Sequence, residues 1–288
     1  MILITGGAGF IGSHYHKKYG GFRVDDLSKG KRDIELELDC TSIEFVEWLK
    51  ENRPEHIIHL AGQSSGERSH IDRVNDYKRN YISTQKLLIA CLDYKPKSIV
   101  FASSVSVYGN KSDAREEDRP EPLSNYGSHK LMSEKLLKDY CNSTGVIGTS
   151  LRIFNVYGDG QDEWDLQQGM ISIYLALAKR GHIIVKGSGN RVRDFVHVDD
   201  VVEAINAALY REGNNYEEIN VGSGVPHRVS EIVEVIAKKY NATYEYLSKR
   251  TAGDADFSYA NILKAEILLD YRVKHNDVIH WLQHDVGR

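Results

Sequence analysis

Cysteine is scarce in this sequence, with only Cys40, Cys91 and Cys141 among 288 residues. The three are widely spaced and odd in number, which excludes a fully paired disulfide framework and the C-x-x-C pairs of zinc and redox sites. We therefore expect a reducing compartment, the cytoplasm. Long apolar runs are also absent: none approaches the roughly 20 residues of a membrane span, and the run from Met1 to Thr5 ends at glycines. The sequence thus predicts a protein that is neither secreted nor inserted in a membrane.

An excess of positive charge is absent as well. The 37 basic and 41 acidic residues give a formal net charge of −4, so there is no basic field to hold a nucleic acid or an anionic membrane. The hydrophobic share of 41% and the charged share of 27% are those of ordinary globular proteins. This composition excludes collagen, coiled coil and wholesale disorder.

Short apolar runs alternate with longer amphipathic ones along the first part of the chain. The alternation is typical of βα units and predicts an α/β fold: a Rossmann-like doubly wound parallel sheet with a smaller C-terminal part. We expect one domain over residues 1–160, to which the chain returns around 195–222, and a second over 161–288. The predicted strands are Met1 to Thr5, Phe22 to Asp25, His56 to Leu60, Ser98 to Ser104, Val146 to Arg152 and Glu218 to Val221. The predicted helices are Ile11 to Lys18, Ser42 to Glu51, Val74 to Leu92, Tyr126 to Tyr140, Met170 to Lys179 and Val201 to Leu209.

The opening segment MILITGGAGFIGSH runs from a buried strand through glycines into a helix. Gly6, Gly9 and Gly12 fit the spacing at which backbone N–H groups and a helix N-terminus bind a pyrophosphate. A plain turn is the alternative, but the position directly after a strand favours a dinucleotide site. The first domain is therefore predicted to bind NAD.

The next predicted strand ends at Val24, Asp25 and Asp26. A carboxylate at this point can accept hydrogen bonds from both ribose hydroxyls of an adenosine and would repel a 2′-phosphate, which favours NAD over NADP. The alternative is that the two acids simply begin a solvated loop.

Tyr126 and Lys130 stand four residues apart at a predicted helix start, so they share one helical face. A nearby ammonium favours the phenolate, and we expect it, together with the positive charge of bound NAD, to lower the pKa of Tyr126 until the phenol can act as a base. One such pair is expected by chance, but hydroxyls at Ser103, Ser104 and Ser106 end a strand about twenty residues earlier. A serine there can hydrogen-bond a reacting oxygen.

These motifs resemble the extended short-chain dehydrogenase/reductases, specifically the nucleotide-sugar epimerases and dehydratases. Besides TGGAGFIGSH and YGSHK, the segments HLAG, LRIFNVYG and RVRDFVHVDD are similar to family motifs in the same order. The resemblance implies Tyr126 as the general base, Lys130 as its partner on the nicotinamide ribose and Ser104 as the hydroxyl residue. It further implies cofactor-binding roles for Gly6, Gly9, Phe10, Ile11, Gly12, Asp25, Asp26, Asp39, Cys40, Leu60, Ala61, Gly62 and Asn80, and substrate-binding roles for Ser104, Ser106, Tyr126, Asn155, Arg193 and Arg250.

Two departures from the family pattern narrow the chemistry. Where the dehydratases carry an acidic pair after the hydroxyl residue and the decarboxylases a glutamate, this sequence has Val105 and Ser106. Water elimination and decarboxylation are thereby disfavoured. Arg250 stands four residues before Asp254, whereas the family often has three, so its implied role as a nucleotide contact departs from the family spacing.

The resulting hypothesis is an NAD-dependent nucleotide-sugar epimerase acting at C4 of a UDP-hexose through a transient keto-sugar. A nucleotide-sugar 4-ketoreductase and a dinucleotide-binding regulator without turnover remain alternatives. The resemblance also implies a homodimer built on the helices around Val74 to Leu92 and Tyr126 to Tyr140. No metal is expected, because the pairs His14/His16 and His280/His284 lack carboxylate or cysteine partners nearby. Loops around Gln63 to His70 and Gln161 to Gln168 are expected to shape the sugar pocket.

Overall fold

A seven-stranded parallel sheet forms the centre of the computed structural model, which describes residues 1–28, 33–161 and 169–286. The strand order is β11-β7-β5-β4-β1-β2-β3, and every neighbouring pair is parallel. The prediction of a doubly wound sheet is therefore confirmed. Its strands are β1 (Ile2–Thr5), β2 (Phe22–Asp25), β3 (Leu36–Glu37), β4 (His56–His59), β5 (Ser98–Ser104), β7 (Ile147–Ile153) and β11 (Tyr216–Val221).

Apolar residues on both faces of the central strands explain why helices cover this sheet on two sides. Successive side chains of a strand point to opposite faces, so each strand contributes to two separate cores. One core contains Leu3, Ile57 and Ile99, and the other contains Ile4, Ile58 and Val100. The backbone register places each trio side by side across three neighbouring strands.

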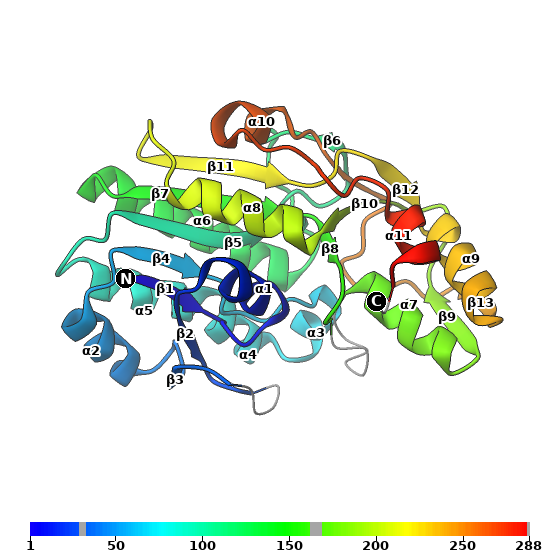
Figure 1. The fold of residues 1–288 in the computed structure, drawn as a ribbon, viewed down its shortest axis with the longest axis horizontal. Coiled ribbons are helices and arrows are strands. Elements are labelled where there is room, and N and C mark those ends of the chain that lie inside the picture. The colour runs from blue at the N-terminus through cyan, green and yellow to red at the C-terminus, as the bar shows by residue number, and fades with distance from the viewer. Residues whose placement is uncertain (29–32, 162–168, 287–288) are drawn as a thin grey trace.

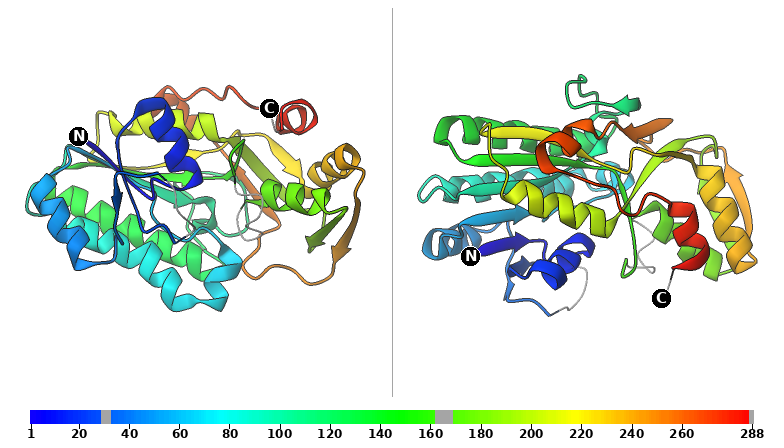
Figure 2. Two further views of the ribbon diagram at one scale, coloured as in Figure 1. Left: turned by 60° about the horizontal axis from the view of Figure 1, so that its bottom comes forward. Right: turned by 45° about the horizontal axis from the view of Figure 1, so that its top comes forward.

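Two layers of helices complete this arrangement (Figures 1 and 2). The first core is covered by α2 (Ile43–Asn52), α5 (Ser83–Cys91) and α6 (Asn125–Thr144). The second is covered by α1 (Phe10–Tyr19), α8 (Val198–Leu209) and α10 (Leu263–Leu269). The left view of Figure 2 shows the two layers on opposite sides of the sheet.

The predicted helix from Val74 to Leu92 differs in the structure. It is divided into α4 (Arg73–Tyr77), a π-helical turn (Lys78–Ile82) and α5, and a short helix α3 (Gly66–Ile71) precedes it. A π turn adds a residue to the helical turn and re-aims the side chains within it. Here it buries the side chain of Asn80.

The remaining elements form a smaller assembly beyond the carboxyl ends of the main strands (Figure 1). A second sheet has the order β12-β10-β14-β6, with β8 paired to β10, and β9 pairs with β13 in a third. A separate core joins these sheets to three helices through Tyr157, Leu175, Ile232 and Trp281. The elements are β6 (Lys111–Ala114), β8 (Asn155–Tyr157), α7 (Met170–Lys179), β9 (His182–Lys186), β10 (Val192–His197), β12 (Pro226–Arg228), α9 (Val229–Tyr240), β13 (Thr243–Leu247), β14 (Phe257–Ala260) and α11 (Val278–His284), together with a 3-10 turn at Val105–Val107.

The predicted return of the chain around 195–222 corresponds to α8 and β11, which pack on and extend the main sheet. The domain boundary at residue 160 stays a prediction. Of the two loops expected to shape the pocket, the first contains α3, and residues 162–168 of the second lie outside the described residues. Within the described ranges, no helix combines the length and the apolar character needed to cross a membrane.

Candidate active site

A cavity of about 480 Å³ lies at the carboxyl ends of the main parallel strands. This is where doubly wound sheets bind their ligands, next to the point at which the strand order reverses. The structure brings most of the predicted residues together here. The lining includes Gly6, Gly9, Phe10, Ile11, Gly12, Asp25, Asp26, Asp39, Cys40, Leu60, Ala61, Gly62, Ser104, Ser106, Tyr126, Lys130 and Asn155.

The glycine turn after β1 forms one wall of the cavity. Gly6 has a φ of +69°, and a methyl group on it would come within 2.7 Å of the backbone nitrogen of Ala61. At Gly12 a methyl group would lie 2.6 Å from the carbonyl oxygen of Gly6. Only glycine therefore fits at both positions. The turn ends at Gly9, the N-cap of α1, where no side chain covers the helix start, so the backbone is open to a pyrophosphate.

Asp25 ends β2 beside this turn. One of its carboxylate oxygens accepts a hydrogen bond from the N–H of Ala8 at 3.0 Å, and the other accepts one from the N–H of Leu27, also at 3.0 Å. Each oxygen keeps a further lone pair that can accept from a hydroxyl. The carboxylate is therefore both a brace for the glycine turn and a suitable acceptor for the two ribose hydroxyls of an adenosine.

Arg79 is a cavity residue that the sequence analysis missed. Its guanidinium lies 2.8 Å from the Asp26 carboxylate and donates to the Ser28 hydroxyl at 3.2 Å. The second acid of the Asp25–Asp26 pair is thus held by an ion pair rather than by solvent. Because Arg79 precedes Asn80 in an unremarkable polar segment, no local pattern distinguishes it.

The helix α6 positions Tyr126 and Lys130. Ser124 caps the helix by accepting a hydrogen bond from the N–H of Gly127 at 3.0 Å. A methyl group on Gly127 would lie 2.3 Å from the carbonyl oxygen of Ser106, so the first turn of α6 packs directly against the 3-10 turn that follows β5. Farther along, Glu134 on α6 forms a buried two-point ion pair with Arg152 on β7, at 3.0 and 2.8 Å.

Ser104, Tyr126 and Lys130 all line the cavity at the carboxyl end of β5. Burial raises the pKa of Tyr126 to about 12, because its effect outweighs that of the hydrogen bond with Ser104, which lowers this pKa. The ammonium of Lys130 donates to the carbonyl of Ala102 at 2.8 Å and lies 5.9 Å from the centroid of the Tyr126 ring. Burial lowers the pKa of Lys130 to about 8.

In the chain by itself, the net shift of the Tyr126 pKa is therefore upward, opposite to the shift expected when Lys130 and bound NAD act together. Both groups are almost fully enclosed by protein, and removal from water disfavours the charged form of each. The negative charge of Asp76 adds to the rise in the pKa of Tyr126. A further positive charge at this end of the cavity would act in the opposite direction, toward a lower pKa of Tyr126.

Asp76 is the second residue missed from the sequence. It is fully buried, and its carboxylate accepts hydrogen bonds from the amides of Gln63 at 2.6 Å and Asn80 at 2.9 Å and lies 2.5 Å from the imidazole of His129. Its charge also opposes the fall in the pKa of Lys130. The four-residue spacing of Asp76 and Asn80 on a predicted helix was the available signal.

Asn80 itself lies beside the lining rather than in it. Its side-chain oxygen is buried without a hydrogen-bond partner. A methyl group on Gly62 would lie 2.6 Å from that oxygen and 3.3 Å from the Lys130 ammonium. Gly62 therefore leaves a small gap beside two polar groups that any larger side chain would crowd.

The residues predicted to bind substrate are less concentrated. Asn155 lines the cavity and donates to the carbonyl of Asp194 at 2.9 Å. Arg193 is buried outside the lining, where it and Arg191 both pair with Asp254. Arg250 also lies outside the lining: it pairs with Asp256 at 2.8 Å, and 46% of its side chain is exposed. The structure thus does not bring Arg193 and Arg250 to the cavity surface.

Comparison with known proteins agrees with this arrangement. Residues 2–222 match the model of the NAD dependent epimerase/dehydratase family. A putative UDP-glucose 4-epimerase of Methanocaldococcus jannaschii is 33% identical, with 99% of each chain covered. The UDP-glucose 4-epimerase of Azospirillum brasilense is 29% identical, with 96% of this chain and 88% of the relative covered.

Solved structures give the same result. The UDP-glucose 4-epimerase of Thermus thermophilus, determined with NAD, is 30% identical with a TM-score of 0.87, covering 98% of this chain and 96% of that one. The UDP-glucose 4-epimerase of Thermotoga maritima, determined with UDP-glucose, has the same identity, TM-score and coverage. The family predicted from the sequence motifs is confirmed: this chain belongs to the NAD dependent epimerase/dehydratase family.

Proposed function

We propose that this protein is an NAD-dependent nucleotide-sugar epimerase that inverts C4 of a UDP-hexose. The observation that carries the proposal is the convergence of Ser104, Tyr126 and Lys130 in the same cavity as the glycine turn and Asp25. Relatives and structural neighbours named UDP-glucose 4-epimerase over nearly the whole chain support the choice of reaction.

The cofactor fits the residues that are present. The glycine turn leaves room for the pyrophosphate, Asp25 offers two acceptors for the adenosine ribose, and the Asn80 oxygen and Lys130 lie beside the gap at Gly62. When bound, NAD supplies the hydride acceptor and donor and a positive charge on its nicotinamide ring. That charge acts in the direction needed to lower the pKa of Tyr126.

In the proposed reaction the chain's own residues move one proton. The Tyr126 oxygen takes the proton of the sugar 4-hydroxyl while the C4 hydride leaves, and it returns that proton after the keto-sugar has presented its other face. Ser104 hydrogen-bonds the reacting oxygen, and Lys130 stabilises the phenolate. Val105 and Ser106 supply no carboxylate beside the sugar, so neither elimination of water nor decarboxylation is assisted.

We further propose that Asn155 and Arg193 bind the substrate diphosphate. In the structure, Arg191 and Arg193 share the single carboxylate of Asp254, and one terminal nitrogen of Arg191 is buried without a partner. Two guanidiniums facing one carboxylate leave an excess of positive charge. A diphosphate is an anion of the kind that would use it.

A homodimer in the cytoplasm completes the proposal. Apolar side chains are exposed along α3 to α6: Ile71, Val74, Ile89, Leu92 and Met132. A second copy of the chain packing on this face would bury them. The three cysteines are free and buried, which suits a reducing compartment. Sedimentation of the wild type and of Val74→Glu tests the dimer; a monomeric wild type would contradict it.

Product analysis tests the function itself. The protein is incubated with UDP-glucose, UDP-N-acetylglucosamine and UDP-glucuronic acid, and the sugars are followed by NMR without added NADH or NADPH. We expect one of them to reach a mixture with its C4 epimer, with the C4 deuterium of a labelled substrate retained. Stoichiometric consumption of added NADH or NADPH with a 4-keto sugar would indicate the 4-ketoreductase instead. Binding of NAD without any turnover would indicate the regulator.

A further inference from the structure

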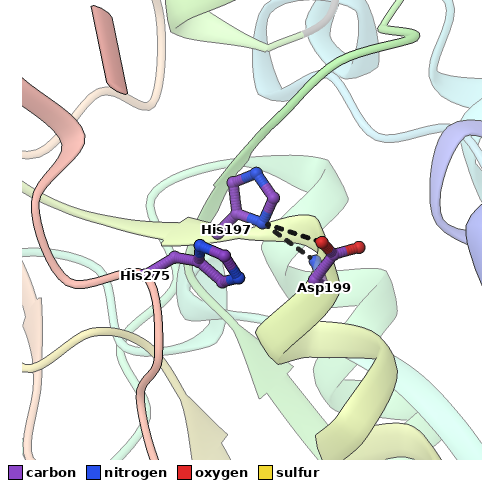
Figure 3. Close-up of side chains that lie close together, drawn as sticks. All are labelled: His197, Asp199 and His275. Atoms are coloured by element: carbon purple, nitrogen blue, oxygen red, sulfur yellow. Dashed lines mark hydrogen bonds and ion pairs between the residues drawn. The ribbon is translucent and has the colours of Figure 1, made fainter. Parts of the chain in front are cut away.

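Three metal-ligating side chains gather outside the cavity, at the start of α8 (Figure 3). His197 ends β10, Asp199 lies in the first turn of α8, and His275 comes from the segment between α10 and α11. One donor atom of each side chain lies within 4.8 Å of the other two donors. Imidazole nitrogen and carboxylate oxygen are ligands that zinc and related divalent ions prefer.

The two chain segments of this cluster are fixed to each other by hydrogen bonds between side chains and backbone. The Asp200 carboxylate accepts hydrogen bonds from the N–H of Lys274 at 3.2 Å and of His275 at 3.0 Å. On the other side, the Tyr157 hydroxyl donates to the carbonyl of His275 at 3.1 Å. The position of His275 is thus set before an ion binds, so ordering the site costs little conformational entropy.

The buried member of the cluster is also held in place. His197 is 8% exposed, and its Nδ1 accepts a hydrogen bond from the N–H of Asp199 at 3.2 Å. The same nitrogen lies 3.7 Å from the Asp199 carboxylate. The ring contacts Tyr157 edge-on, with centroids 5.2 Å apart, and its centroid lies 4.3 Å from that of His275. One ligand is therefore rigid, while Asp199 and His275 are reachable from solvent.

We propose that His197, Asp199 and His275 bind one divalent transition-metal ion of the zinc class. Ligands around such an ion lie roughly 3 to 3.5 Å apart, given bond lengths near 2 Å. The donor atoms of His197 and Asp199 are 3.7 Å apart, which is close to that spacing. Rotation of the exposed His275 side chain brings its donor nitrogen to a similar distance from both. The remaining coordination position faces solvent and takes water. Metal binding at Nδ1 of His197 replaces the hydrogen bond that this nitrogen accepts from the N–H of Asp199.

An ion bound at these three residues would link the start of α8 on the main sheet to the C-terminal segment before α11. α8 packs on the core of the main sheet, whereas His275 lies three residues before α11, which packs on the separate C-terminal core. An ion bound only in the folded state stabilises that state by an amount that grows with the logarithm of the ion concentration. The site is distinct from the proposed catalytic residues, so its occupancy is measurable independently of turnover.

Zinc titration of the full chain tests this inference. The protein is stripped with a chelator and titrated with zinc chloride by calorimetry, with thermal unfolding in parallel. We expect one ion per chain and a rise in Tm. His275→Gln and Asp199→Asn should each weaken zinc binding at least tenfold and abolish the rise in Tm. Both residues are solvent-accessible, so folding should persist, which circular dichroism and NAD binding check.

A matched control lies on α11. His280 and His284 are one helical turn apart with ring centroids 4.6 Å apart, and His280 lies 3.9 Å from Asp285. The double variant His280→Gln/His284→Gln should bind zinc as the wild type does. Zinc binding that follows this pair instead, or a wild type that binds no zinc, would overturn the proposal.

Discussion

The two sides of the cavity are built in different ways. The cofactor side consists of a glycine turn and the ends of neighbouring strands, and its key residues fall in short sequence motifs. The proposed substrate side draws on residues that are far apart in the chain: Asn155 lines the cavity, and the cluster of Arg191, Arg193 and Asp254 lies outside that lining. Backbone shape therefore dominates the first side, and side-chain charge dominates the second.

This difference teaches where specificity resides. Backbone contacts require glycine at positions 6 and 12 of the turn. Few sequences can therefore form this turn. A charge cluster assembled from separate loops can be rebuilt in many ways while keeping its net charge. We infer that the cofactor side is common to the reaction class and that the substrate side selects the sugar nucleotide.

The largest expected effect comes from Tyr126→Phe, which removes the proposed base where the two sides meet. Turnover should fall by about 100- to 10,000-fold, the usual contribution of a general base. NAD affinity should stay close to that of the wild type, because the glycine turn and Asp25 are unchanged. Steady-state kinetics and NAD titration measure the two quantities. Unchanged turnover would contradict the assignment of the base.

Next in size is Asp254→Asn on the substrate side. It leaves Arg191 and Arg193 buried without a counter-charge, and we expect a loss of about 3 to 5 kcal/mol in the free energy of unfolding. Added UDP should restore part of that loss. Asp256→Asn is the control, because its ion pair with Arg250 is half exposed and should contribute at most about 1 kcal/mol. Equal losses in urea denaturation would argue against a special role for the cluster.

The pH dependence of stability isolates Lys130. Burial lowers its pKa to about 8 from 10.5, so between these values the unfolded chain binds more protons than the folded one. Stability from this group is therefore fully present above pH 10.5 and is lost as the pH falls through 8. Relative to Lys130→Met, the wild type should gain on the order of 3 kcal/mol across this window. A constant difference between the two proteins would refute the shift.

The smallest effect is expected on the cofactor side from Asp25→Asn. Loss of a charged acceptor for two ribose hydroxyls should weaken NAD binding by about tenfold and reduce the preference over NADP. The matched variant Asp26→Asn should change NAD affinity less, because the Asp26 carboxylate is already paired with Arg79. Fluorescence titration with NAD and NADP measures both affinities. A larger loss of NAD affinity in Asp26→Asn than in Asp25→Asn would assign the ribose contact to Asp26 instead.

The same contrast explains what could be predicted from the sequence. Six of the seven strands of the main sheet were predictable because they carry apolar residues on both faces, as at Leu3 and Ile4, whereas the two-residue β3 was not predicted. The second sheet was not, because strands such as β8 and β12 have three residues each, too few to show a periodic pattern. Its residues acquire neighbours only through long-range pairing.

Within the site, position was easier to predict than electrostatics. The spacing places Tyr126 and Lys130 on one helical face, and both line the cavity, but in the chain by itself the net shift of the Tyr126 pKa is upward. Burial of both groups and the charge of Asp76 decide that shift, and neither follows from local spacing. Local spacing also could not predict the cluster of His197, Asp199 and His275, because His275 is more than seventy residues from the other two.

The position of β11 bears on how the protein is synthesised. This strand borders β7 at the edge of the main sheet, yet it comes from residues 216–221. Until a ribosome has delivered that segment, a nascent chain carries all other strands of the sheet with the border of β7 unpaired. Such an open border can recruit other chains. Fragments that stop near residue 160 are therefore expected to aggregate, and truncation libraries should yield well-behaved products only when they include the late strand.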